Sequence, residues 1–179
     1  MNTGNKNVAL TVKEIVICAI FIALSFVLAN VKVMGSVAFD SLPAFLGGLL
    51  LGAPYGAAIG ALGHLMTALL SGFPFGLLTH LIVAGMMAVC VFVFTLVFRK
   101  LSGKSLILAY VLAAIVGTAI NGPVEVFVLS PILLSMFGGV PGLISFAILL
   151  TITAACNIVI AIVLHILLEK RLGGKGYLR

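Results

Sequence analysis

The chain carries very little charge. Of its 179 residues, ten are basic and four are acidic, 8% in total, whereas a soluble domain is about 25% charged. So few charges do not cover a water-exposed surface, and we expect the chain to be embedded in lipid. The hydrophobic residues, 63% of the chain, form continuous runs. A transmembrane barrel would alternate apolar and polar residues, so the runs predict helices.

The motifs of common enzymes are also missing. There is no Walker A motif, so this chain is not expected to hydrolyse ATP. Neither a Gly-x-Ser-x-Gly elbow nor a His-Glu-x-x-His motif occurs. Cys18, Cys90 and Cys156 lie in three different apolar runs without metal-ligand spacing. We therefore predict no catalytic residue, no metal site and no cofactor in this chain. A membrane-embedded enzyme with His64 or His80 as base and Glu125 as acid is kept as the alternative class.

The apolar runs predict an all-α membrane protein with six transmembrane helices in one domain over residues 1–179, at about 20 apolar residues per crossing. The predicted spans are 12–30, 41–53, 55–71, 77–99, 105–122 and 142–169. Between the last two lies GPVEVFVLSPILLSMFGGVPG, which contains three prolines and Glu125. We predict a long, partly broken helix followed by a loop for that segment.

The basic residues predict the orientation. With six spans and both termini in the cytoplasm, nine of the ten fall inside and only Lys32 falls outside, as the positive-inside rule expects. The nine are Lys6, Lys13, Arg99, Lys100, Lys104, Lys170, Arg171, Lys175 and Arg179. The net charge of +6 does not indicate a nucleic-acid partner, because these residues cluster at the ends of apolar runs and not on one amphipathic face.

Polar side chains within or beside membrane spans are costly, so each needs a reason. Most of them fall toward the predicted outer face: Asn30, Lys32, Asp40, Ser71, Thr79, His80, Asn121 and Glu125. His64 and Asn157 fall nearer the middle of the membrane. This distribution predicts a polar cavity that opens outward and is closed below by apolar packing. A passive channel would need polar residues in the inner half as well.

Several of these residues have a second interpretation. Lys32 and Asp40 flank a loop, where solvation also accounts for them. His64 follows Gly52, Gly56 and Gly60 at fourth positions, a small-xxx-small surface on which membrane helices pack closely. His64 and Asn157 are therefore either interhelical hydrogen-bonding residues or ligand contacts.

Asn121 and Glu125 are four residues apart, so a helix would place them on one face. Pro123 lies between them and frees the carbonyl of Ala119. Freed backbone at membrane depth is tolerated where it is buried in protein or lines a cavity. Glu125 is therefore predicted to anchor a ligand, with exposure at the outer interface as the alternative.

The hairpin SGFPFG carries Phe73 and Phe75 on either side of Pro74. The two rings either stack on a planar ligand or lie at the membrane interface.

The chain resembles the substrate-binding S components of energy-coupling-factor (ECF) vitamin transporters. The resemblance rests on six short spans, both termini inside, and the Ala19-x-x-x-Ala23 step in the first helix. The stretch GSVAFDSLPAFLGGLLLGAPYGAAIGALGHLMTALLSGFPFGLLTHL looks like the branch that includes pantothenate and α-ribazole carriers.

This resemblance implies a subunit of an ABC importer in the bacterial plasma membrane. Such a subunit captures a vitamin or a vitamin precursor in an outward-facing cavity. It then docks on a transmembrane coupling protein driven by two cytoplasmic ATPases, which use the ATP. Ala19 and Ala23 would meet the coupling protein.

The resemblance, together with the polar residues, implies a ligand site. Its expected members are Asn30, Lys32, Asp40, His64, Phe73, Phe75, His80, Asn121 and Glu125. The predicted outer face has one lysine and two acidic residues, Asp40 and Glu125. This charge balance favours the benzimidazole riboside α-ribazole over the carboxylate pantothenate, which is the alternative ligand. The absence of Trp argues against a thiamine-type aromatic cage.

Overall fold

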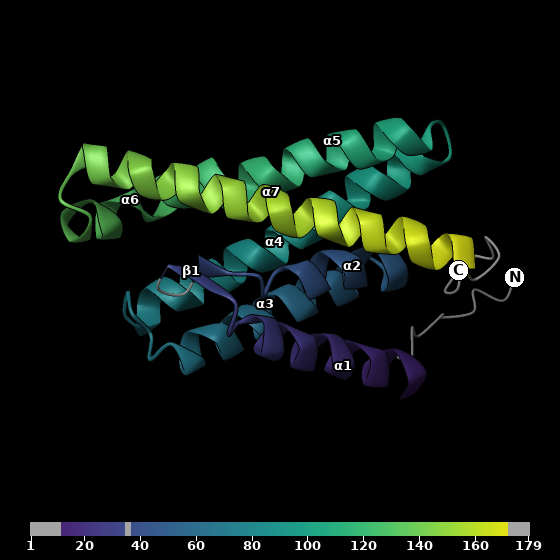
Figure 1. The fold of residues 1–179 in the computed structure, drawn as a ribbon, viewed down its shortest axis with the longest axis horizontal. Helices are drawn as coiled ribbons and strands as arrows, with labels where there is room; N and C mark the ends of the chain where they lie inside the picture. The colour runs from purple at the N-terminus through teal and green to yellow at the C-terminus, as the bar shows by residue number, and fades with distance from the viewer. Residues whose placement is uncertain (1–11, 35–36, 172–179) are drawn as a thin grey trace, which may run out of the picture.

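The computed structural model describes residues 12–34 and 37–171, and most of them are helical (Figure 1). In chain order the elements are α1 (Val12–Leu28), β1 (Lys32–Met34), β2 (Val37–Ala38), α2 (Leu42–Leu51), α3 (Ala53–Leu70), α4 (Leu77–Ser102), α5 (Leu106–Ala119), the π-helical turn η1 (Ile120–Val124), α6 (Glu125–Met136) and α7 (Val140–Arg171). The strands β1 and β2 pair antiparallel. Apart from this short strand pair all the elements are helical, so the predicted all-helical bundle is confirmed.

Four helical segments of the described chain are long and apolar enough to cross a membrane: α3, α4, the continuous 106–136 segment and α7. The helices α1 and α2, with 17 and 10 residues, are shorter. Each predicted span corresponds to a helical segment within a few residues, but six crossings and cytoplasmic termini stay predictions.

The segment after α5 was predicted to be a partly broken helix followed by a loop. α6 continues directly from η1, and only residues 137–139 separate it from α7. At Pro123 the chain widens into a π turn, in which the Glu125 N–H donates to the Ile120 carbonyl. Pro131 has no N–H, so the Phe127 carbonyl lacks its usual helical hydrogen-bond donor. The Ser130 hydroxyl donates to that oxygen at 2.7 Å. Both prolines are thus accommodated inside a helix, and the predicted loop is confined to residues 137–139.

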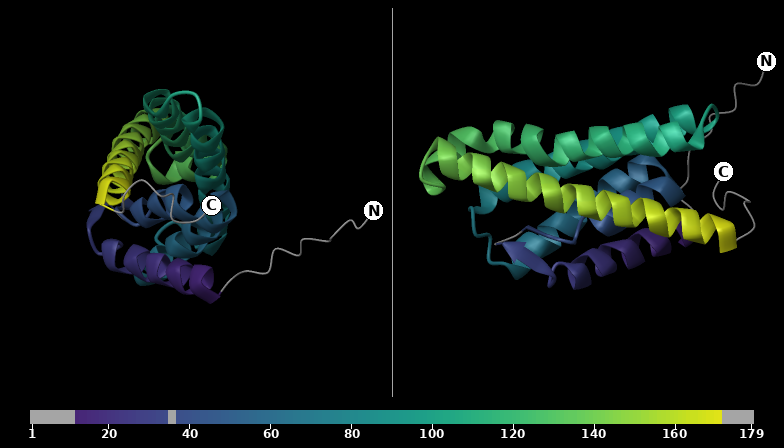
Figure 2. Two further views of the ribbon diagram at one scale, coloured as in Figure 1. Left: turned by 90° about the vertical axis from the view of Figure 1, so that its right-hand side faces the viewer. Right: turned by 45° about the horizontal axis from the view of Figure 1, so that its top comes forward.

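The short helix α2 lies at the centre of the molecule. It packs against α1, α3, α4 and α7, and every residue except Leu50 is buried. Phe45 of α2 contacts Phe94 of α4 edge to face, with ring centroids 5.0 Å apart. The view along the bundle in Figure 2 shows the longer helices arranged around it. A helix with apolar side chains on all faces needs such an enclosed position.

The predicted small-residue surface brings α2, α3 and α4 close together. A Cβ on Gly56 would lie 2.6 Å from the Cα of Gly48, and one on Gly60 would lie 3.2 Å from the Met87 carbonyl oxygen. Gly52 has a different role, because it separates α2 from α3 with φ of 118° and faces the Arg99 guanidinium. The glycines therefore allow direct backbone contact between helices.

The start of α1, the α4–α5 connection and the end of α7 lie at the same end of the bundle (Figure 1). Six of the predicted cytoplasmic basic residues belong to these segments: Lys13, Arg99, Lys100, Lys104, Lys170 and Arg171. Lys6, Lys175 and Arg179 lie outside the described residues. These six residues thus share one end, as the orientation prediction requires.

Candidate ligand-binding site

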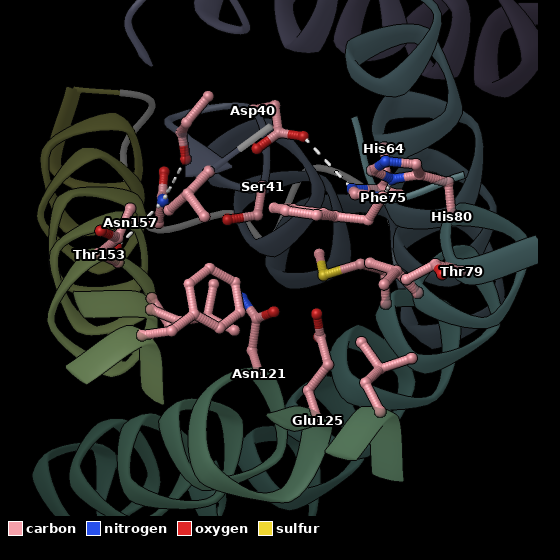
Figure 3. A pocket seen from close by; sticks show the side chains of 18 of the residues that line it. Asp40, Ser41, His64, Phe75, Thr79, His80, Asn121, Glu125, Thr153 and Asn157 are labelled. Atoms are coloured by element: carbon pink, nitrogen blue, oxygen red, sulfur yellow. Dashed lines mark hydrogen bonds and ion pairs between the residues drawn. The ribbon is translucent and has the colours of Figure 1, made fainter. Parts of the chain in front are cut away.

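A cavity of about 50 Å³ lies toward the opposite end of the bundle (Figure 3). Its walls come from β2 and the residues after it, α3, the α3–α4 hairpin, α4, η1, α6 and α7. The lining residues are Val37, Ala38, Asp40, Ser41, His64, Phe75, Thr79, His80, Val83, Met87, Asn121, Glu125, Leu129, Leu133, Phe146, Leu150, Thr153, Ala154 and Asn157. The cavity has room for several water-sized molecules, at roughly 10–15 Å³ each. Most of the polar residues predicted to gather on one side are therefore brought together.

Asp40, His64 and His80 form a buried polar chain along one wall. The Asp40 Oδ2 lies 3.8 Å from the His64 Nδ1, and the His64 Nε2 lies 3.1 Å from the His80 Nδ1. The His80 Nε2 has no hydrogen-bond partner among the described residues. The chain links the β2–α2 connection to α3 and α4. His64 is thus both an interhelical hydrogen-bonding residue and part of the cavity wall.

Asn121 and Glu125 point into the cavity from η1 and α6 (Figure 3). They are only 5% and 4% exposed, so the alternative of an interfacial, exposed Glu125 is wrong. The Glu125 Oε2 has no hydrogen-bond partner in the part of the chain that the structure describes. A buried carboxyl oxygen without a partner is costly. Glu125 therefore has the environment expected of a ligand anchor.

Asn157 joins α7 to the strand β2. Its amide nitrogen donates to the Ala38 carbonyl at 3.2 Å and to the Thr153 carbonyl at 3.1 Å. Its Oδ1 lacks a hydrogen-bond partner within the described ranges. Asn157 therefore holds β2 in place and also lines the cavity.

Aromatic side chains form another part of the wall. The Phe75 ring lies against His80 at a centroid distance of 5.9 Å and against Phe146 at 6.0 Å. Phe137 stacks on Phe146 at 4.4 Å. Phe73, at φ 51°, contacts the edge of the His80 ring from outside the lining set. Of the two hairpin aromatics, only Phe75 reaches the cavity.

The remaining predicted residues lie elsewhere. Asn30 is exposed, and its amide donates to the Phe26 and Val27 carbonyls at 3.2 Å each, at the end of α1. The side chain of Lys32 lies outside the described part of the structure. Ala19 and Ala23 are exposed on α1 and do not line the cavity.

Sequence reasoning missed the apolar members of the wall and did not propose Thr79, Ser41 or Thr153 as ligand residues. The apolar members, such as Val83, Met87, Leu129 and Leu133, resemble any core or lipid-facing residue. Their helical spacing is the signal in the sequence that could have identified them. Thr79, Val83 and Met87 recur every four residues on α4, as do Glu125, Leu129 and Leu133 on α6. Extending each helix face from its polar member would have found them.

A family model described as the substrate-specific component of ECF transporters matches residues 13–169. A solved structure described as the S component of a bacterial ECF transporter has a similar fold, with a TM-score of 0.58. Its sequence is 18% identical, and the match covers 90% of this chain and 96% of the other. Comparison with the curated proteins found no match.

S components bind small-molecule substrates and work with a transmembrane coupling protein and ATPases. They are transporter subunits, so the interpretation of His64, His80 and Glu125 as enzyme residues is wrong. The family match covers nearly all of the described helices, and the fold agrees with it. This chain therefore belongs to the family of ECF transporter substrate-specific components, the membrane subunits that determine which solute is taken up.

Proposed function

We propose that the cavity holds the transported solute and that this solute is α-ribazole, a neutral to weakly basic riboside. The observation that carries the proposal is the chemistry of the wall. The lining residues include Asp40 and Glu125 but neither a lysine nor an arginine. A bound carboxylate would lie beside these two acidic groups without a fixed cation, and like charges in a buried site repel strongly.

The aromatic part of the wall supports a planar ligand. Phe75 and Phe146 line the cavity beside His80, a residue that is 1% exposed. Aromatic side chains pack favourably on planar rings, and ligand sites commonly combine such surfaces with a few polar groups. The benzimidazole would lie against this wall and the ribose near the polar groups.

Pantothenate remains the second candidate. The observation in its favour is the pair His64 and His80, because protonated imidazoles would supply the positive charge that a carboxylate requires.

Delivery would follow docking on a coupling protein driven by two ATPases, with this chain crossing the bacterial plasma membrane six times and both termini in the cytoplasm. Ala19 and Ala23 support a docking role for α1, because they are exposed and four residues apart on one helix. Small residues at this spacing let another helix approach closely. No cofactor is assigned to this chain, since ATP would be used by the partners.

A calorimetric titration of the purified protein tests the ligand. The protein, in detergent and without ATP, is titrated with α-ribazole, pantothenate, thiamine and unrelated nucleosides. We expect one site that prefers α-ribazole. Binding of pantothenate without binding of α-ribazole would transfer the assignment to pantothenate. A lack of binding across the panel would overturn the assignment of the cavity to these solutes.

A further inference from the structure

Three residues that line the cavity each have one buried polar atom without a hydrogen-bond partner in the described structure: His80 Nε2, Glu125 Oε2 and Asn157 Oδ1. These residues are 1%, 4% and 1% exposed. Buried polar atoms are normally hydrogen-bonded, and an unpaired one costs roughly 1–3 kcal/mol. Three of them around one cavity indicate that a bound molecule supplies the partners.

Two of these atoms have a clear hydrogen-bonding role. The amide oxygen of Asn157 accepts, because its amide nitrogen already donates to the Ala38 and Thr153 carbonyls. When Glu125 is ionised, its Oε2 also accepts. The role of the third atom, His80 Nε2, depends on which nitrogen of that ring carries the proton.

The polar chain determines that proton's position. The carboxylate of Asp40 lies nearest the His64 Nδ1, at 3.8 Å, and favours a proton on that nitrogen. The Nε2 of a neutral His64 then carries no proton and accepts a hydrogen bond from the His80 Nδ1 at 3.1 Å. A neutral His80 with its proton on Nδ1 has an acceptor at Nε2. With Glu125 ionised, all three unpaired atoms are then acceptors.

We propose that Asp40 and His64 are positioning residues that hold the His80 Nε2 as an acceptor. We further propose that His80, Glu125 and Asn157 form an acceptor triad that selects solutes with several hydrogen-bond donors, such as the vicinal hydroxyls of a sugar. This inference rests on the proposal that the cavity holds the solute. It goes beyond that proposal by stating which chemical feature of the solute is recognised.

Nitrogen NMR of the protein labelled with ¹⁵N-histidine tests the first step without any ligand. The chain has three histidines, and His64→Gln, His80→Gln and His165→Gln assign them. At neutral pH we expect the wild-type His80 to be protonated on Nδ1 and unprotonated on Nε2. A proton on Nε2 would overturn the inference, whether or not any solute binds.

Asp40→Asn tests the cause of this arrangement. An amide either donates or accepts, so it no longer imposes the proton's position on His64. We expect the proton on His80 to move at least partly to Nε2. His165→Gln, which changes a buried histidine outside the cavity, should leave the His80 signals unchanged. An unchanged His80 tautomer in Asp40→Asn would overturn the positioning role of Asp40.

Titration with α-ribazole and its 2′,3′-dideoxy analogue tests the triad. We expect the analogue to bind about tenfold more weakly or worse, because two donors are lost from a buried site. Equal affinity would overturn the donor requirement and leave the α-ribazole proposal intact. If neither compound binds, the ligand proposal fails, and the NMR experiment alone decides the acceptor role of His80.

Discussion

The His64 Nε2 lies 3.1 Å from the His80 Nδ1, and this contact joins α3 to α4 inside the cavity wall. The two residues are separated by sixteen positions and by the hairpin that carries Phe73 and Phe75. The contact therefore couples the hairpin's position to the site. Asp40 extends the same chain to the connection after β2.

Replacing Glu125 by Gln should weaken solute binding about tenfold or more, equal to about 1.4 kcal/mol. The substitution keeps the size of the side chain but replaces a carboxyl group that lines the cavity by an amide. Calorimetric titration with α-ribazole measures the effect. Glu169→Gln is the control, because the Glu169 side chain is 42% exposed and lies outside the cavity. Equal affinities for the two variants would remove Glu125 from the ligand site.

Replacing Asn157 by Asp should lower both the melting temperature and the affinity for solute. The new carboxylate no longer donates to the Ala38 carbonyl, so β2 loses its attachment to α7. We expect a loss of about 1–3 kcal/mol in the free energy of unfolding. Asn30→Asp makes the same chemical change at an exposed position and should cost less than about 0.5 kcal/mol. Thermal unfolding in detergent compares the two, and similar losses would contradict the role of Asn157.

Replacing Gly56 by Ala should destabilise the bundle by about 1–3 kcal/mol. The added Cβ would lie 2.6 Å from the Gly48 backbone, which has no side chain to move aside. Gly85→Ala is the matched control on α4, since nothing lies within 4 Å of its added Cβ. That control should be neutral or stabilising by up to about 1 kcal/mol. The thermal midpoints of the two variants decide, and a Gly56→Ala protein as stable as Gly85→Ala would disprove the close contact.

Replacing Ala19 by Leu should leave solute binding unchanged and abolish uptake by the complete transporter. Ala19 is exposed on α1 and does not line the cavity, so a larger side chain blocks only an approaching helix. Uptake of radiolabelled solute into vesicles that contain the whole complex, alongside calorimetry of the isolated chain, separates the two effects. Cys156→Leu makes a small-to-large change on an exposed part of α7 and should retain uptake. Normal uptake with Ala19→Leu would assign docking to another surface.

The membrane character of the chain and the order of its helices followed from the sequence alone. Continuous apolar runs need helices in lipid, where backbone groups must be satisfied within each segment. Charge placement predicted that basic residues such as Lys13, Arg99 and Lys170 share one end. The polar exceptions predicted Asp40, His80, Asn121 and Glu125 as members of one site, because such residues are retained in a membrane only for a reason.

The tertiary structure decided the rest. A broken helix was expected around Pro123 and Pro131, but the π turn and the Ser130 hydroxyl that accommodate them are local solutions that composition does not reveal. Only the packed structure shows that Asn30 turns back onto its own helix end. The contacts between Asp40, His64 and His80, and the unpaired atoms opposite them, depend on the relative placement of separate helices. The hydrophobic pattern determines which residues avoid water, but the surroundings of the His80 and Glu125 side chains are determined by how α3, α4, α6 and α7 pack.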